Sequence, residues 1–231
     1  MPANEPATSF RPRPTVSVIT PAYNAAKTLR RACESVNAQT FQDWEHVIVD
    51  DGSTDGTHGT IIDSTRLGSR TVIRTTNSGQ GAALNTGIRY STGRYVAFLD
   101  ADDEFLPLHL EARFNTLEGA PDIDLLWGGI ELVSEDEEQA MVPDMERGYG
   151  LIHVGECVVQ GTIFARRKVC EAIQFREDRH VWYQDFEFVR QAGELFRCAR
   201  FEQPTYRYYR DSGLSLVDRV KQEWQAKAAV V

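Results

Sequence analysis

One short stretch of the sequence places an apolar strand directly before a cluster of acids. Residues 95–99 are apolar, Gly93 precedes them, and Asp100, Asp102 and Asp103 follow them. Such a run is typical of a buried strand, and the strands of open α/β sheets present ligands at their carboxyl ends. Neighbouring carboxylates repel one another, so a shared cation would stabilise them, and oxygen ligands favour Mg²⁺ or Mn²⁺. The alternative is a solvated acidic turn in which Asp102 or Asp103 caps the next helix.

Length, charge and cysteine spacing exclude several classes of protein. The 231 residues can form one large α/β domain or two small ones, with a substantial core. Their net charge of −9 argues against nucleic-acid binding, because general binders need clustered Lys and Arg to release counterions. The four cysteines form no CxxC pair, which favours reduced thiols over a zinc site or a disulfide framework.

No segment of the sequence has the pattern of a membrane span or a signal peptide. Residues 1–14 are rich in Pro and polar residues and lack an apolar core, so we expect a flexible N-terminal lead. No run approaches the roughly 18 apolar residues of a membrane span. We therefore expect a cytoplasmic protein with at most a peripheral contact to the inner face of a membrane.

The order of the expected strands and helices is typical of βαβ units. Pro21 is expected to end the first strand, and Asn24 is expected to cap the first helix. Residues 134–150 are expected to form a mobile loop with a solvated acidic run. The strands are expected at residues 15–20, 45–50, 71–74, 95–99, 124–130 and 161–166. The helices are expected at residues 29–36, after the turn at 77–81, at 108–117 and 167–173, from 185 onward and at 218–229.

The glycine-rich turn at residues 77–81 does not match two common nucleotide-binding motifs. It lacks the third glycine and the following acid of a dinucleotide fingerprint, and it has no Walker lysine. NAD binding is therefore disfavoured, and the small residues would instead let a helix pack closely beside the central strand.

Asp185 lies at the expected start of a helix among aromatic residues. Its neighbours in the sequence are Trp182, Tyr183, Phe186 and Phe188. An acid at this position is commonly a helix cap. A carboxylate in aromatic surroundings is also a candidate general base, because desolvation raises its pKa toward the working pH.

Four blocks of the sequence carry a resemblance to a known family. They span residues 16–24, 49–57, 79–87 and 98–103. Together and in this order they resemble the family-2 glycosyltransferases, which have the GT-A fold. The resemblance covers residues 15–110 and weakens beyond them. Gln184 and Asp185 occupy the place of the family's Glu-Asp pair, with Gln in place of the usual Glu.

The resemblance implies a fold for the chain and a division of that fold into subdomains. The fold would be α/β and Rossmann-like, with a mixed, mostly parallel sheet flanked by helices and one domain in two subregions. A nucleotide-sugar-binding subdomain would span residues 15–104 and an acceptor-binding subdomain residues 105–215. Residues 1–14 would precede them, and residues 216–231 would form a C-terminal helix.

The resemblance also implies roles for single residues. Pro21, Tyr23 and Asp51 would surround the nucleobase, Asp100 would address the ribose and the metal region, and Asp102 would bind the divalent ion. Asp185 would be the catalytic base. Leu84 stands where some relatives have Arg, so a basic contact to the diphosphate would be missing or would come from Arg207 or Arg210. The complete implied nucleotide-sugar site is Pro21, Tyr23, Asn24, Asp51, Gly79, Asn85, Asp100, Ala101 and Asp102.

The function implied is transfer of one sugar, with inversion, from a nucleotide-diphospho-sugar to a hydroxyl of a saccharide or lipid-linked acceptor. The donor is expected to be a UDP-sugar and the cofactor Mn²⁺ or Mg²⁺. The chain lacks the Gln-x-x-Arg-Trp segment of processive relatives, which favours single addition. Two alternatives remain open. The first is a sugar-phosphate nucleotidyltransferase, which would carry a Gly-rich, Arg-containing loop where this chain has residues 21–24. The second is a non-catalytic binding module, which would not need the candidate metal-binding and catalytic acids that this chain has.

Overall fold

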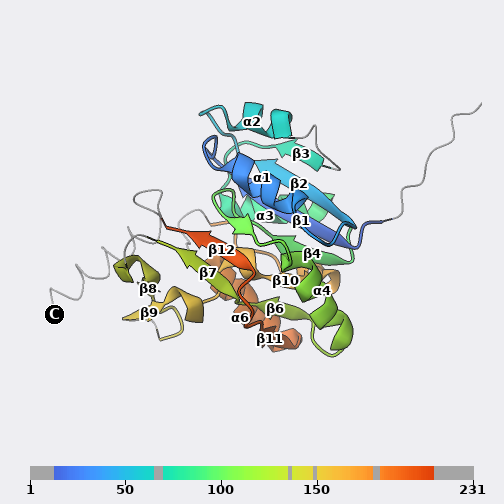
Figure 1. Cartoon of the computed structure of the whole chain (residues 1–231), viewed down its shortest axis with the longest axis vertical. Coiled ribbons are helices and arrows are strands. Elements are labelled where there is room, and N and C mark those ends of the chain that lie inside the picture. Colours follow the sequence, from blue (N-terminus) through green and yellow to red (C-terminus); the bar gives the residue numbers. More distant parts are fainter. Residues whose placement is uncertain (1–12, 65–69, 135–136, 148–149, 179–182, 211–231) are drawn as a thin grey trace, which may run out of the picture.

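A mixed seven-stranded sheet forms the centre of the protein (Figure 1). The computed structural model describes residues 13–64, 70–134, 137–147, 150–178 and 183–210. In these residues the strand order is β11-β6-β10-β4-β1-β2-β3, and only β10 runs antiparallel to its neighbours. The predicted α/β class with a mostly parallel sheet is confirmed. The strands are β1 Val16–Ala22, β2 Trp44–Asp50, β3 Arg70–Arg74, β4 Tyr95–Phe98, β6 Leu125–Trp127, β10 Phe164–Arg166 and β11 Cys198–Arg200.

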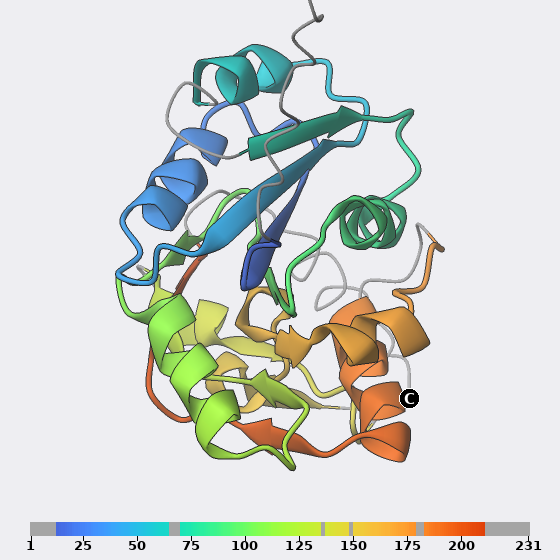
Figure 2. The same cartoon turned by 90° about the vertical axis from the view of Figure 1, so that its right-hand side faces the viewer.

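Helices cover both faces of the β1–β2–β3 part of this sheet (Figure 2). Because side chains alternate along a strand, successive residues of β2 pack into different clusters. Ile48 packs in one cluster with Leu29, and Val47 and Val49 pack in another with Ala83. The helices on the two sides are α1 Leu29–Asn37 with α2 Thr57–Ser64, and α3 Gln80–Tyr90.

The central strand β4 separates the two larger cores in the same way. Val96 and Phe98 pack in the core that contains Phe188, whereas Tyr95 and Ala97 pack in the core that contains Leu110. Phe188 comes from α6 Gln184–Leu195, and Leu110 comes from α4 His109–Gly119. A short helix, α5 Arg167–Ala172, follows β10 and contributes to the same core as α6.

Two small sheets accompany the central sheet. One has the order β5-β12-β7, formed by Glu104–Phe105, Tyr206–Tyr209 and Ile130–Val133. The other pairs β8 Met141–Pro143 with β9 Leu151–His153. Short 3-10 helices lie at η2 Glu137–Ala140, η3 Val154–Glu156 and η4 Gln160–Thr162.

The single strand expected at residues 124–130 is two strands in different sheets. Gly128 and Gly129 have φ values of +94° and +75°, so the chain turns between β6 and β7. A Cβ on Gly129 would lie 2.3 Å from the carbonyl oxygen of Gln203, which leaves room for glycine alone. The break carries the chain from the central sheet to the small sheet with β12.

Pro21 does not end the first strand, because β1 continues to Ala22. The pairing of β1 with β4 ends at Ile19 and Phe98, and the N–H of Leu99 donates to the carbonyl of Ile19 beyond it. The backbone groups of Pro21 face the same side of β1 as those of Ile19, which is the side of β4. Because β4 has ended at this point, the N–H that proline lacks would have had no partner in the sheet.

Asn24 does not cap the first helix, and the region expected to be a loop is partly ordered. Helix α1 begins at Leu29 after Thr28, and Asn24 has a φ of +52°. Asn tolerates this left-handed conformation better than most residues. Residues 134–150 contain η2 and β8, and the pairing of β8 with β9 explains why this segment is not a free loop. Helix 218–229 and Trp182 lie outside the described residues.

None of the helices in the described part of the chain is long and apolar enough to cross a membrane. All four cysteines are free thiols, as the sequence predicted.

Candidate active site

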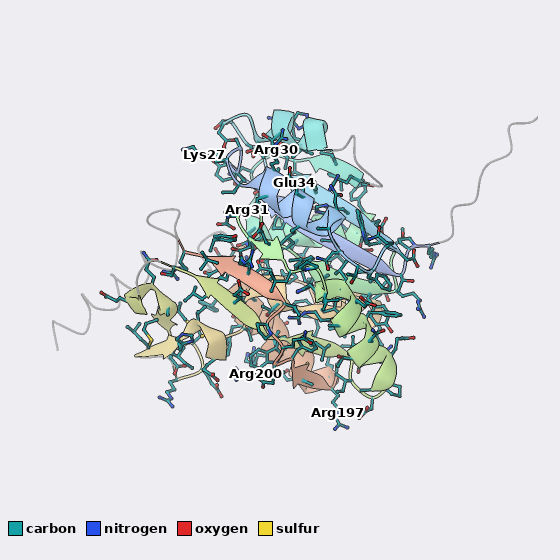
Figure 3. All side chains as sticks on the ribbon, in the orientation of Figure 1. Lys27, Arg30, Arg31, Glu34, Arg197 and Arg200 are labelled. Atoms are coloured by element: carbon teal, nitrogen blue, oxygen red, sulfur yellow. The ribbon has the colours of Figure 1, made fainter. Side chains whose placement is uncertain are left out.

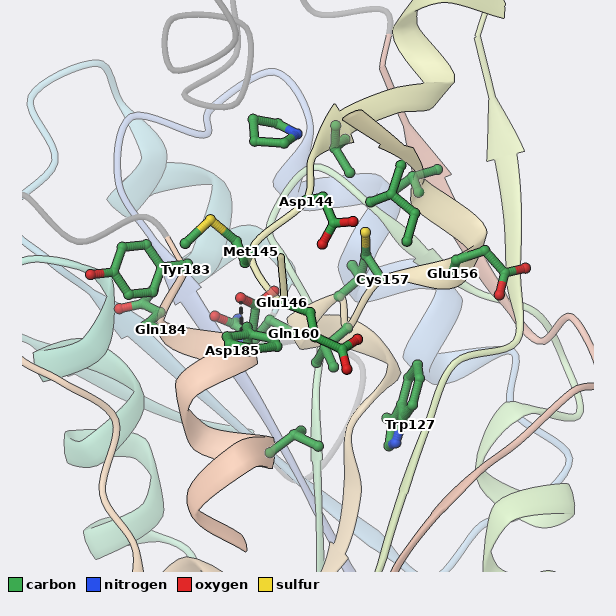
Figure 4. Close-up of a pocket in the computed structure, with 18 of the residues that line it drawn as sticks. Trp127, Asp144, Met145, Glu146, Glu156, Cys157, Gln160, Tyr183, Gln184 and Asp185 are labelled. Atoms are coloured by element: carbon green, nitrogen blue, oxygen red, sulfur yellow. Dashed lines mark hydrogen bonds between the residues drawn. The ribbon is translucent and has the colours of Figure 1, made fainter. Parts of the chain in front are cut away.

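Two cavities, each of about 690 Å³, meet at the carboxyl ends of β1, β2 and β4. Gln80 and Asp100 line both cavities. The first cavity lies between β1, the loop after β2 and the start of α3, and the second is closed by η4, α6 and the β8–β9 region (Figure 4). Eight of the predicted nucleotide-sugar residues line the first cavity: Pro21, Tyr23, Asn24, Asp51, Gly79, Asp100, Ala101 and Asp102.

Asn85 is the predicted binding residue that the structure places elsewhere. Its side-chain amide donates to the carbonyl of Phe175 at 2.8 Å and accepts from the N–H of Phe175 at 2.9 Å. It also donates to Glu177 at 3.0 Å. Asn85 is buried on the side of α3 away from the first cavity, so it fixes the 175–177 segment and does not line the predicted site.

Asp51 holds the glycine-rich turn that leads into α3. Its carboxylate accepts hydrogen bonds from the N–H groups of Ser78 and Gly79, each at 2.8 Å, and from the hydroxyl of Thr75 at 3.1 Å. Gly79 has a φ of +96°, which glycine adopts without strain. A carboxylate offers about four acceptor positions, so three bonds leave Asp51 able to accept a further donor from the cavity.

The loops on either side of Asp51 are tied together across the first cavity. The Asn24 side-chain oxygen accepts from the N–H of Thr54 at 2.9 Å, and the N–H of Asn24 donates to the Ser53 hydroxyl at 3.0 Å. The Asp55 carboxylate accepts from the N–H of Ala26 at 3.1 Å. These bonds give the cavity a fixed rim from which Tyr23 projects with half of its surface exposed.

Asp100 lies at the boundary of the two cavities within a network of amides. Its Oδ1 accepts from Gln160 at 2.8 Å and from Gln80 at 3.1 Å, and Gln80 in turn accepts from Gln184 at 2.8 Å. Burial raises the pKa of Asp100 to about 8, and the charges of Asp102 and Asp185 add to this shift. Without a cation, Asp100 therefore keeps its proton at neutral pH.

Asp103 has a structural role, although the sequence groups it with Asp100 and Asp102. Its carboxylate accepts from the hydroxyl of Tyr206 at 2.5 Å and from the N–H of Tyr209 at 2.9 Å. It is fully buried and neither caps the next helix nor faces a cavity. Asp103 thus fastens β12 to the acidic turn.

Arg31 of α1 supports the same turn from outside (Figure 3). Its guanidinium donates to the backbone carbonyl of Asp102 and lies 3.5 Å from the centre of the Tyr209 ring. The Asp102 side chain itself is exposed and lines the first cavity.

Asp100 and Asp102 fit the expected divalent cation. The described residues contain no group of three or more His, Cys, Asp or Glu side chains that could hold a metal ion on their own. Mg²⁺ is commonly bound by one or two carboxylates together with phosphate oxygens of a substrate. Burial is the main cause of the raised pKa of Asp100, and a cation between Asp100 and Asp102 would remove the repulsion that adds to it.

Asp185 is the second residue of α6 and lines the second cavity. Its carboxylate accepts from the N–H of Phe186 at 2.8 Å and from the backbone N–H of Gln160. Burial raises its pKa to about 6, and these two bonds limit the shift. Of its predicted aromatic neighbours, Tyr183 and Phe186 line the cavity, whereas Phe188 stacks on Phe175 in the core.

Neither arginine proposed for the diphosphate lines the first cavity. Arg207 donates to Glu131 at 2.8 Å and to Glu104 at 3.3 Å, and Arg210, which directly follows β12, is buried. Leu84 is fully buried in the core and could not carry a ligand contact. Among the residues that the structure describes, Lys27 is the cation that lines this cavity, and it is exposed in the loop before α1 (Figure 3).

Sequence reasoning missed Gln80, Gln160 and Lys27. Gln80 follows Gly79, which has a positive φ, at the start of a helix. A residue at the end of the glycine-rich turn could have been proposed as a site residue from its position alone. Gln160 belongs to a three-residue 3-10 helix that no periodic pattern marks. It approaches Asp100 and Asp185 only through the fold.

The family profile described as Glycosyl transferase family 2 matches residues 17–214. The chain belongs to glycosyl transferase family 2. An Escherichia coli member, UDP-Glc:alpha-D-GlcNAc-diphosphoundecaprenol beta-1,3-glucosyltransferase WfgD, is 33% identical over 121 residues, which cover 52% of this chain and 47% of WfgD. The uncharacterized glycosyltransferase RP339 of Rickettsia prowazekii is 28% identical over 190 residues, or 75% of this chain and 59% of that protein.

Solved structures of other glycosyltransferases share the fold. The mannosyltransferase PcManGT of Pyrobaculum calidifontis, in complex with GDP-Man and Mn²⁺, has a TM-score of 0.71 at 21% identity and covers 95% of this chain and 65% of that one. At this identity the likeness shows the GT-A fold alone. This family-2 chain spans about half the length of the first curated relatives it matches.

Proposed function

We propose that this family-2 chain transfers a single sugar from a nucleotide-diphospho-sugar to an acceptor hydroxyl, with inversion. The observation that carries the proposal is the pair of adjoining cavities, each with its own acid. Asp102 lines the first cavity, Asp185 lines the second, and Asp100 lies between them. Two acids in separate cavities suit two separate tasks: holding the leaving diphosphate and taking the acceptor proton.

The first cavity would hold the donor. Pro21 and Tyr23 would flank the nucleobase, and Asp51 would accept a hydrogen bond from the base edge with the acceptor position that the turn leaves open. Asp100 and Asp102 would hold Mn²⁺ or Mg²⁺ against the diphosphate, beside Lys27. The name of WfgD includes UDP-Glc, which supports a UDP-sugar as donor.

The second cavity would hold the acceptor, and Asp185 would be its general base. With a pKa near 6, Asp185 is mostly ionised at neutral pH and is still more basic than an ordinary carboxylate. A bound divalent cation would stabilise the negative charge that develops on the leaving diphosphate. Attack from the Asp185 side, opposite the leaving group, inverts the anomeric carbon. The name of WfgD supports a lipid-linked saccharide as one class of acceptor.

We further propose that residues 15–104 form the donor-binding subdomain and residues 105–215 the acceptor-binding subdomain. The first cavity is lined by residues 21–102 alone, and most of the second is lined by residues from 127 onward. The two subdomains share the central sheet, in which β10 pairs with β4.

The test is turnover of a panel of UDP-, GDP- and dTDP-sugars with Mn²⁺ and with EDTA. We expect release of one nucleoside diphosphate, with Mn²⁺ required. Formation of sugar 1-phosphate and a nucleoside triphosphate on adding pyrophosphate would instead identify a nucleotidyltransferase. Binding of a nucleotide sugar with no turnover in any acceptor mixture would identify a non-catalytic module.

A further inference from the structure

The second cavity carries negative charge that its own cations do not neutralise. Five of its lining residues are carboxylates and one, Arg190, is a cation. Arg190 donates to Glu194 at 2.8 Å on the same helix. It therefore brings no net positive charge to the cavity.

Two of the five carboxylates are neutralised by arginines outside the cavity lining. Glu156 receives bonds of 2.6 and 3.3 Å from Arg200. Asp144 accepts from the N–H of Arg147 at 3.0 Å, and the guanidinium of Arg147 lies 3.5 Å away. Figure 4 shows Glu156 on the side of the view away from Tyr183, with Asp144 between them.

The carboxyl groups without an arginine partner are those of Asp100, Glu146 and Asp185, and Asp100 keeps its proton at neutral pH without a cation. A cation shared with Asp102 would neutralise Asp100 in the loaded enzyme. Glu146 is exposed and Asp185 is half-buried, both line the cavity, and neither forms an ion pair within the described part of the chain. A ligand in the second cavity therefore meets two carboxylates and no free cation from the described lining.

Gln160 adds a separate requirement for a hydrogen-bond donor. Gln160 is 4% exposed, its Nε2 donates to Asp100, and its Oε1 has no hydrogen-bond partner among the residues that the structure describes. A buried acceptor without a partner is costly, so a ligand that donates to Oε1 gains free energy there. A sugar hydroxyl can donate to Oε1, whereas the oxygens of a carboxylate or a fully ionised phosphate only accept.

Apart from Gln80 and Gln184, the remaining lining is apolar and aromatic. Trp127, Phe186 and Tyr208 line the cavity together with valines from residues 142–159. Such walls suit the C–H faces of a sugar ring, and none of these side chains carries a positive charge that would attract an anionic group.

From these contacts we infer that the sugar unit entering the second cavity as acceptor is uncharged, with no phosphate, carboxylate or sulfate on that unit. This inference rests on the proposed function, since it names the acceptor class of the same site. It allows a charged group on a more distant part of the acceptor, such as the diphosphate of a lipid carrier.

The test compares acceptors that differ in one charge. Pairs such as methyl glucoside with methyl glucuronide, and methyl N-acetylglucosaminide with its 6-phosphate, are offered with Mn²⁺ and the donor that the chain turns over. We measure transfer and, for sugars that are not turned over, saturation transfer from protein to sugar by NMR. We expect the neutral member of a pair to be favoured about tenfold or more, because a like charge near two carboxylates is repelled.

Reversing the charge of one carboxylate tests whether electrostatic repulsion causes the preference for neutral sugars. Glu146→Lys should reduce the preference for the neutral sugar at least about threefold, since it replaces a repelling charge with an attracting one at the cavity. Glu138→Lys makes the same charge change at an exposed site outside the cavity and should leave the preference unchanged.

Two outcomes would overturn the inference if donor turnover is still observed. One is equal use of neutral and anionic sugars as acceptors. The other is the absence of both transfer and NMR contact for every neutral sugar. An equal effect of the two lysine variants would overturn its electrostatic basis. Absence of all donor turnover would overturn the proposed function itself, and with it this inference.

Discussion

Asp100, Asp102 and Asp103 lie within four positions of the chain, yet their carboxylates have different surroundings. Asp102 is exposed at the first cavity, Asp100 accepts from two amides at the boundary, and Asp103 is buried against Tyr206 and the backbone of β12. The sequence predicted the cluster and its place at a strand end, because the apolar run before it is unambiguous. It could not assign the roles, since each depends on residues about 60 to 106 positions away.

At Asp51, a substitution separates ligand binding from support of the turn. Asp51→Ala should weaken UDP binding by about 1–3 kcal/mol, because donors on the turn and on the base lose their acceptor. Calorimetry with UDP and Mn²⁺ measures this loss. Thr75→Val is the matched control, since it removes one bond to Asp51 and keeps the carboxylate with its bonds to Ser78 and Gly79. If Thr75→Val weakens UDP binding as much as Asp51→Ala does, Asp51 acts only through the turn.

At Asp185, the pH dependence of turnover reports the proposed base. The carboxylate form accepts the proton, so the rate should rise with pH and reach a plateau above a midpoint near pH 6. Asp185→Asn should lower turnover by about 10² to 10⁴ and remove this midpoint. Donor affinity should stay near that of the unsubstituted chain. A variant that keeps more than roughly a tenth of the turnover contradicts the assignment, and it directs attention to Glu187 or Asp178.

Three buried strands of the central sheet were predicted well, and three short strands were missed for a physical reason. Strands β1, β2 and β4 lie within two residues of their expected bounds, because buried parallel strands are continuous apolar runs. Strands β8, β9 and β11 have three residues each, which is too few to show a period. They form through pairing with partners elsewhere in the chain, and β8 and β9 help to build the wall of the second cavity.

At the scale of the strands, His46 should make stability depend on pH. It is fully buried in β2, 2.9 Å from the Thr20 hydroxyl of β1, and accepts from Arg70 of β3 at 3.3 Å. Burial lowers its pKa from 6.5 to about 3, and the charge of Arg70 contributes. Between these values the unfolded chain binds more protons, so the free energy of unfolding falls as the pH falls below 6.5.

Urea unfolding at pH 7.5 and pH 5.0 measures this contribution. His46 should account for about 2 kcal/mol of the loss between the two pH values. His46→Gln keeps a polar side chain that does not titrate. The free energy of unfolding of this variant should therefore fall by about 2 kcal/mol less between the two pH values. The same loss in both proteins would show that His46 does not titrate on unfolding.

At the scale of the whole molecule, one sheet joins the two proposed subdomains. Strands β6, β10 and β11 from the second half extend the sheet that β1 to β4 begin. Gln80 and Asp100 lie at the resulting junction and face both cavities. The resemblance covered the first half, so the first cavity was largely predicted from the sequence. The second cavity was not, because Gln160 and Glu146 come from segments that carry no shared motif and meet only in the fold.

Calorimetry of UDP binding with and without Mn²⁺ tests the central claim, which is that the first cavity holds a nucleotide diphosphate through a cation on Asp100 and Asp102. The unsubstituted chain should bind UDP at least about tenfold more tightly with Mn²⁺ than with EDTA, as a cation shared by carboxylates and phosphates requires. Asp102→Ala should lose this difference, whereas Asp122→Ala, at an exposed site paired with Arg197, should keep it. UDP affinity that is the same with Mn²⁺ and EDTA, and the same in Asp102→Ala, would contradict the account.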